Sequence, residues 1–139
     1  MNANELRVGN WVEANSPIMQ VKEISEHTVG LYMPGSEADP FLYDIEEIKP
    51  IVLSPEILEK CEGFKKMKND WWQKEYFTDC MEATEVMKIT INLKSFRCGA
   101  IDTDIENGGL VMTGKRVEHL HTFQNLIFAL TGEELNYKH

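Results

Sequence analysis

The first fifty residues alternate short apolar runs with turn-forming residues. Runs rich in β-branched and aromatic residues cover 5–14, 18–24, 28–33 and 41–45 and are separated by NSP, SEH and PGSEADP. In the first run, alternation places Leu6, Val8 and Val12 on one side of a strand, with Arg7, Gly9 and Trp11 on the other. This pattern predicts a small β-roll, SH3-like in type, over residues 1–52. Strands belonging to one larger mixed sheet are the alternative.

A short helix is predicted just after this region. Ser54 can cap it, Pro55 suits its first position and Gly63 is placed to end it. Its apolar stripe comprises Ile57, Leu58 and Cys61, and Phe64 follows as a contact back onto the helix. We interpret it as a docking helix without a site of its own.

A second group of strands follows the aromatic-rich stretch DWWQKEYF. Met87, Ile89, Ile91 and Leu93 alternate with Lys88, Thr90 and Asn92. Residues 95–101 can form the next strand, and NGG at 107–109 is a hairpin-type turn into 110–113. We therefore predict an α+β region over 53–139, with a three- or four-stranded antiparallel sheet that is wet on one face. Whether this region forms one compact unit with 1–52 is left open.

The C-terminal segment predicts a helix over Leu120–Thr131 that packs on the sheet. Its apolar face comprises Leu120, Phe123, Leu126, Ile127 and Leu130. A different side carries His121, Gln124, Asn125 and Phe128. A helical His119 would be rotated about 200° away from His121. In an extended segment these two histidines would instead share a face. In neither case does spacing alone bring the polar groups together, and we favour packing over metal ligation for both histidines.

Composition narrows the class of protein. The chain has 139 residues, 42% of them apolar, and its three cysteines are widely spaced. We read them as reduced thiols rather than a disulfide framework. No apolar run approaches the ~20 residues of a membrane helix, and no secretory signal is visible. The expected location is the cytoplasm, with no membrane association.

The charge argues against nucleic acid as a partner. The net charge is −9, and residues 1–50 carry 3 basic and 9 acidic side chains. An electrostatic grip on phosphates needs a basic face. We read the acidic front half mainly as a contribution to solubility. Competition for a basic site on a partner is the lesser alternative.

Motifs for chemistry are missing from the sequence. It contains no nucleophile elbow, no His-Glu-x-x-His and no phosphate-cradling glycine loop, so no catalytic residue, cofactor or metal is expected. Asp102, Asp104 and Glu106 alternate in a way that could suggest a cation cluster, although a solvated loop beside NGG is the plainer interpretation.

Three segments resemble a family of small proteins of Bacteroides-type bacteria, many of them carried by prophages and other mobile elements. They are ELRVGNWV, IKPIVLSPEILEKCEGF and VEHLHTFQNLIFALTGEEL. The last segment of that family typically reads YVHQLQNLYFALTGEEL. Here Leu120 replaces the usual Val, and Thr122 and Phe123 replace Gln-Leu, whereas His121, Gln124, Asn125 and ALTGEEL match. The resemblance implies an intracellular, accessory role and no particular activity.

Two hypotheses follow. The first is a non-catalytic interaction module that binds a protein; its candidate residues are Trp71, Trp72, Tyr76, His121, Gln124 and Asn125. Alternation places Trp71 and Trp72 on opposite faces of a strand, so a one-sided sheet cannot bury both. The alternative is a nucleic-acid accessory protein that stacks bases on the N-terminal roll through Trp11, Tyr32, Phe41 and Tyr43. An enzyme ranks below both, because it would need a pocket joining His121 to the carboxylates at 102–106. The oligomeric state is left open.

Overall fold

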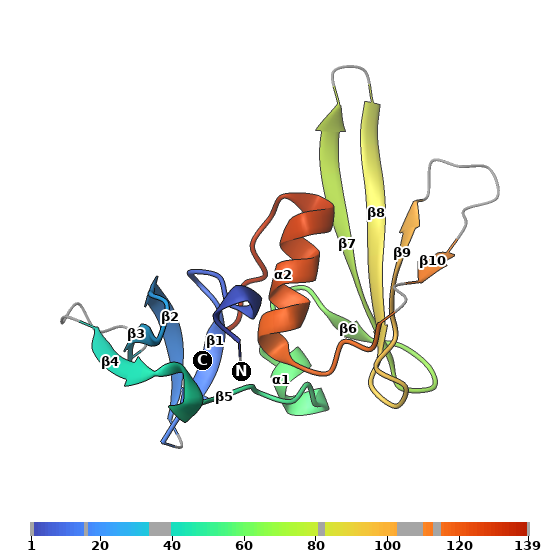
Figure 1. The fold of residues 1–139 in the computed structure, drawn as a ribbon. Coiled ribbons are helices and arrows are strands. Elements are labelled where there is room, and N and C mark those ends of the chain that lie inside the picture. Colours follow the sequence, from blue (N-terminus) through green and yellow to red (C-terminus); the bar gives the residue numbers. More distant parts are fainter. Residues whose placement is uncertain are drawn as a thin grey trace. The chain divides into compact units, whose positions relative to one another are not determined.

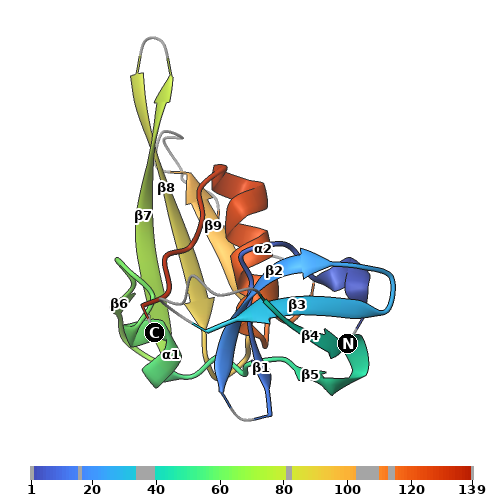
Figure 2. The ribbon, with the colours of Figure 1, turned by 90° about the vertical axis from the view of Figure 1, so that its left-hand side faces the viewer.

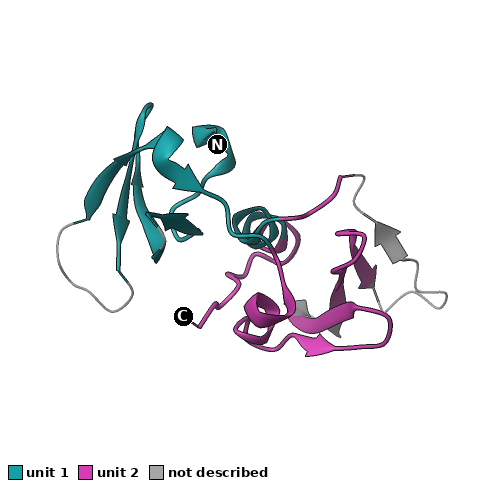
Figure 3. Ribbon diagram, turned by 90° about the horizontal axis from the view of Figure 1, so that it is seen from below, with its two compact units in different colours: residues 1–52, 119–126, 139 teal, residues 53–118, 127–138 magenta. Residues whose placement is uncertain are grey.

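The structure is a computed structural model that describes residues 2–15, 17–33, 40–80, 83–102, 110–112 and 115–138. For residues 78–80, 83–86, 102 and 110–112 it describes the backbone alone. The chain forms two compact units (Figure 3). The first unit comprises Met1–Val52 and His119–Leu126, and the second comprises Leu53–Glu118 and Ile127–Lys138. The C-terminal helix α2 (Leu120–Thr131) therefore contributes residues to both units.

The first unit is a curled antiparallel sheet with the strand order β4-β3-β2-β1-β5 (Figure 1). Its strands are β1 (Trp11–Ala14), β2 (Ile18–Ile24), β3 (Thr28–Tyr32), β4 (Phe41–Asp44) and β5 (Ile48–Lys49). The 3₁₀ turns η1 (Ala3–Glu5) and η2 (Ile45–Glu47) precede β1 and β5. Strands β1 to β4 pair consecutively as hairpins, and β5 returns to pair with β1. The predicted β-roll is confirmed.

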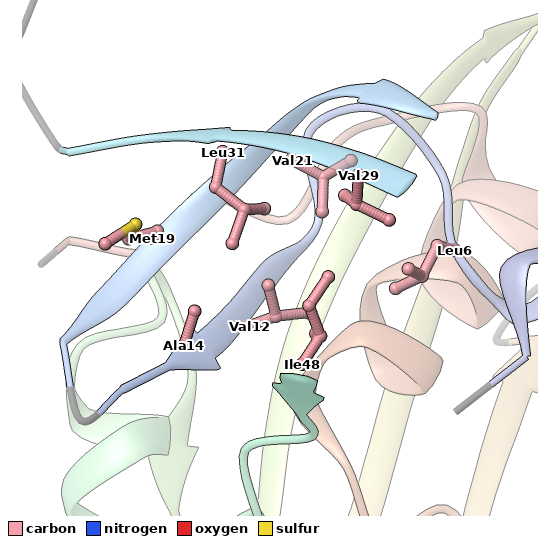
Figure 4. Close-up of a cluster of buried hydrophobic side chains, with 8 residues drawn as sticks. All are labelled: Leu6, Val12, Ala14, Met19, Val21, Val29, Leu31 and Ile48. Atoms are coloured by element: carbon pink, nitrogen blue, oxygen red, sulfur yellow. The ribbon is translucent and has the colours of Figure 1, made fainter. Parts of the chain in front are cut away.

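The core of the first unit follows from alternation along these strands. Alternate residues of β1, β3 and the first half of β2 point to the same side, where the side chains form one cluster (Figure 4). Its members are Leu6, Val12, Ala14, Met19, Val21, Val29, Leu31 and Ile48. One side of this sheet therefore forms the hydrophobic core of the first unit.

The predicted strand over 5–14 is too long. β1 begins only at Trp11, and residues 7–10 form a turn in which the Asn10 N–H donates to the Arg7 carbonyl at 3.0 Å. Gly9 has a φ of 99° there, a conformation that glycine adopts without a steric penalty. The turn breaks the alternation, so Val8 is 55% exposed although Leu6 and Val12 are buried.

The second unit contains a five-stranded antiparallel sheet in the order β10-β9-β8-β7-β6. Its strands are β6 (Lys65–Lys66), β7 (Trp71–Cys80), β8 (Ala83–Asn92), β9 (Cys98–Asp102) and β10 (Leu110–Met112). The hairpin of β7 and β8 is the longest pairing and runs in unbroken register from Trp71↔Asn92 to Cys80↔Ala83 (Figure 2). The α+β class is confirmed, and β6 is added to the three or four strands that the sequence predicted.

The short helix α1 (Pro55–Glu59) forms where expected but ends earlier. Ser54 Oγ accepts a hydrogen bond from the Ile57 N–H at 3.3 Å, and Pro55 occupies the first turn. Gly63 does not end the helix. With a φ of 85° it turns the chain toward β6, and a Cβ at this position would lie 2.8 Å from Lys74 Cε.

Helix α2 has the predicted bounds, but the predicted division into a buried apolar face and a separate polar face is only partly right. Leu120, Phe123 and Ile127 are fully buried, as an apolar face should be, whereas Leu130 is exposed. On the polar side, His121 and Gln124 are buried as well. None of the described helices combines the length and apolar character that crossing a membrane requires.

Candidate binding site on the second sheet

Adjacent tryptophans lie on opposite faces of β7, as alternation predicts. Trp72 is 3% exposed and shares its face with the buried side chains of Tyr76, Ile89 and Ile91. Trp71 is only half-buried and shares the other face with Gln73. Of the three aromatic candidates on this strand, Trp72 and Tyr76 therefore belong to the core face, and Trp71 alone remains accessible.

The Trp71 face is hollowed, and the reason is side-chain size. Thr90 and Gly99 are paired in register across β8 and β9, and both are buried. The Thr90 hydroxyl donates to the Gly99 carbonyl at 3.4 Å. These small residues leave a depression of about 480 Å³ among larger neighbours. The depression, which we call the Trp71 hollow, is lined by Met67, Lys68, Asn69, Trp71, Gln73, Thr90 and Ile101.

A hydrogen-bonded turn holds Trp71 in place. Asn69 and Asp70, just before it, have φ values of 58° and 64°, which asparagine and aspartate tolerate better than most residues. The Asn92 side chain donates to the Asn69 carbonyl at 3.0 Å and accepts from the backbone N–H groups of Lys94 and Ser95, each at 2.9 Å. Asn92 thus joins the turn before β7 to the turn after β8.

Both of these turns are basic. Segments 65–70 and 93–97 carry five cations and one carboxylate, Asp70, in a protein with a net charge of −9. The cations are the exposed Lys65, Lys66, Lys68, Lys94 and Arg97. Further along the same face, Lys88 Nζ lies 3.7 Å from Glu75 Oε1. These two segments, which adjoin the Trp71 hollow, therefore carry a net positive charge, against the sign of the whole chain.

In the first unit, Gln124 and Asn125 hold the N-terminal segment in place. Gln124 Oε1 accepts from the Trp11 N–H at 2.9 Å, and its Nε2 donates to the Gly9 carbonyl at 3.3 Å. Asn125 Oδ1 accepts from Asn10 Nδ2 at 2.9 Å, and its Nδ2 donates to the Glu5 carbonyl at 2.8 Å. These side chains serve the fold, and a binding role for them stays a prediction.

His119 and His121 come together in an arrangement between the two predicted alternatives, because His121 lies in α2 and His119 lies in the bridge segment just before it. His119 forms an isolated bridge with Val52 just before the helix, and its ring stacks on that of His121 with centroids 5.8 Å apart. His121 is 2% exposed, and its Nε2 lies 4.0 Å from Glu5 Oε2. Nδ1 of His121 has no hydrogen-bond partner among the described residues. Burial lowers the pKa of His121 and the neighbouring His119 lowers it further, while Glu5 opposes both effects.

Buried thiols and phenols in the second unit are not poised for chemistry. Burial raises the pKa values of Cys61 and Cys98 to about 12 each, and it also raises the pKa of Tyr76. Such thiols stay protonated at neutral pH and are poor nucleophiles. Among the described residues, no group of three or more His, Cys, Asp and Glu side chains could hold a metal ion. The side chains of Asp102, Asp104 and Glu106 lie outside the described part of the chain.

The aromatic residues of the N-terminal roll form no common platform. Trp11 is buried, and Lys22 Nζ lies 5.0 Å from the centroid of the Tyr32 ring. Tyr43 packs against the core cluster, and Phe41 is exposed.

Sequence reasoning missed most of the residues around Trp71. Met67, Gln73, Thr90 and Ile101 were not selected, although Thr90 was correctly placed on the face opposite Ile89 and Ile91. The one signal that could have found them is the pairing of the small residues Thr90 and Gly99 on the face of Trp71. That pairing can be recognised only when the register between β8 and β9 is known.

Comparison of the chain with protein-family models, with curated proteins and with solved structures finds no match. The functional argument therefore rests on the geometry above.

Proposed function

We propose that this protein is a non-catalytic binding module and that the Trp71 hollow receives a side chain of a protein partner. The proposal rests on Trp71, which is half-buried and lines a depression on the open face of the second sheet. Met67 and Ile101 add apolar lining to the same depression. Tryptophan is among the residue types enriched at binding hot spots. Gln73, Asn69 and Thr90 supply the few polar groups that orient a ligand.

The charge around the hollow suggests the chemistry of the partner. Five cations, on β6 and on the two turns beside the hollow, favour an acidic protein surface and would repel a basic one. The intracellular, accessory role implied by the family resemblance agrees with a binding module and is part of the same proposal.

Nucleic-acid binding through the N-terminal roll has less support. Trp11 is buried, and the strands of the roll lie in the most acidic part of the sequence. Phosphates would be repelled there. Binding of nucleic acid at the basic turns beside Trp71 is a possible outcome of the experiment below and would contradict a protein partner.

The test is affinity purification of the tagged protein from its own host cells, under mild conditions, with mass spectrometry and nucleic-acid quantification of the eluate. Four versions are compared: wild type, Trp71→Ala, Thr90→Leu and Phe41→Ala. Thr90→Leu fills the hollow from its floor, and Phe41→Ala removes an exposed aromatic side chain of the first unit.

We expect one stoichiometric protein partner with wild type and Phe41→Ala, and its loss with Trp71→Ala and Thr90→Leu. Retention of the partner by both hollow variants would contradict the proposal. Recovery of nucleic acid in place of a protein would also contradict it. Circular dichroism of each variant verifies that the fold is retained.

A further inference from the structure

The edge of β7 is only partly covered by β6. β6 pairs with β7 at two positions, Lys65↔Gln73 and Lys66↔Trp72, and the chain then turns away at Gly63. Among the described residues, no strand pairs with this edge of β7 beyond Gln73. Because β7 is ten residues long, most of its length has an open edge on this side.

The register identifies which backbone groups point out of that edge. The Trp71 carbonyl accepts from the Met67 N–H at 2.7 Å, so the polar groups of Trp71 face β6 rather than β8. The β7–β8 register is unbroken, and backbone direction alternates along a strand. The N–H and C=O groups of Glu75 and Phe77 therefore point the same way, away from β8.

Side chains around this edge form a second depression that adjoins the Trp71 hollow. It has a volume of about 400 Å³ and is lined by Gly63, Lys65, Met67, Gln73, Lys74 and Glu75. Met67 and Gln73 line both depressions. Phe77, the next residue on the face of Trp71, is 60% exposed. An extended chain at this edge would therefore lie next to the Trp71 hollow.

We propose that the partner offers an extended acidic segment, which adds a strand to β7 at Glu75 and Phe77 and places an apolar side chain in the Trp71 hollow. This inference rests on the proposed function. Strand addition supplies affinity through main-chain hydrogen bonds and specificity through side-chain pockets. Charge favours an acidic occupant: Lys65 and Lys66 flank the open edge, and the exposed carboxylate of Glu75 lies 3.7 Å from Lys88 Nζ.

A proline scan of the edge tests this directly. Proline lacks the N–H and is tolerated in an edge strand where that N–H faces solvent. Phe77→Pro removes an outward N–H without removing a β8 ladder bond, and Phe77→Ala removes the same side chain but keeps the N–H. Glu75→Pro and Glu75→Ala form a second matched pair. Thermal unfolding and tryptophan emission establish that each variant is folded.

The probe is a synthetic nine-residue peptide of alternating glutamate and valine with a central tryptophan, and its lysine-for-glutamate counterpart is the control. We expect the wild-type protein to bind the acidic peptide and not the lysine counterpart. Each proline variant should weaken binding about tenfold relative to its alanine partner, the effect of losing one backbone hydrogen bond and leaving the partner's carbonyl unpaired.

Equal binding by the proline and alanine variants would overturn strand addition, as would absence of binding by the acidic peptide. If Trp71→Ala still abolishes partner capture in either case, the proposed function stands and only this inference fails. Concentration-dependent dimerisation that is lost in Phe77→Pro but kept in Phe77→Ala would identify a second copy as the occupant and would overturn the acidic segment.

Discussion

Trp71 and Trp72 are neighbours in the sequence, yet one lines an open hollow and the other is 3% exposed on the core face of the same strand. Strand geometry alone produces this separation, because successive side chains point to opposite faces. Substitutions at these two adjacent positions therefore test different properties: Trp71 tests binding and Trp72 tests stability.

The two tryptophans should differ sharply in their effect on stability. Trp72→Ala removes a large buried side chain and is expected to lower the free energy of unfolding by about 3–5 kcal/mol. Trp71→Ala should cost about 1 kcal/mol or less, because its side chain is half-buried beside a hollow. Urea unfolding monitored by circular dichroism measures both. Equal losses would show that Trp71 is a core residue.

Gln124 should hold the start of β1 in place. Gln124→Met removes the hydrogen bonds to the Trp11 N–H and the Gly9 carbonyl and leaves both backbone groups without this partner. We expect a loss of about 1–3 kcal/mol in the free energy of unfolding and faster hydrogen exchange at the Trp11 amide. Gln73→Met, the same exchange at a half-buried glutamine of β7, is the control. Unchanged exchange at Trp11 would refute the role of this side chain.

His121 should make stability depend on pH. Its folded pKa lies below the ordinary value of 6.5, so the unfolded state binds the proton more readily. The contribution to stability is therefore complete above pH 6.5 and is lost as the pH falls from 6.5 through the folded pKa. Burial is the largest cause of this lowering and His119 adds to it, whereas Glu5 opposes both.

The measurement is the change in melting temperature between pH 7.5 and pH 5.5. The decrease should be smaller for His121→Gln than for wild type. His27→Gln is the control, because the side chain of His27 is 82% exposed. An identical decrease in wild type and His121→Gln would show that protonation of His121 does not contribute to the pH dependence of stability.

Cys61 and Cys98 should resist alkylation in the folded protein. Their pKa values of about 12 leave about one thiol in ten thousand ionised at pH 8, and both side chains are buried. Iodoacetamide treatment followed by peptide mapping should find both unmodified natively and both modified in urea. Rapid native labelling of either residue would contradict its burial.

Local signals in the sequence predicted much of the fold. Ser54 and Pro55 mark the start of α1, and alternation in 87–91 identifies the buried Ile89 and Ile91. Gly9 produced the main local error, because a left-handed turn there was hidden within an apparently continuous strand pattern.

The candidate site was harder to predict because it depends on pairing between strands. The Trp71 hollow exists because Thr90 lies opposite Gly99 in register, a relationship that one strand cannot reveal. Gln124 and Asn125 were selected as an unexplained polar face. Their partners are at positions 5–11, more than a hundred residues away in sequence, and no spacing rule connects them.

The central claim is that the Trp71 hollow is occupied by a partner in the cell. Hydroxyl-radical footprinting of the protein, purified in buffer and again in extract of its host, tests this without knowledge of the partner. We predict that oxidation of Trp71 and Met67 is several-fold slower in extract, relative to the exposed Phe41. Equal relative rates in buffer and extract would contradict a binding function for this face.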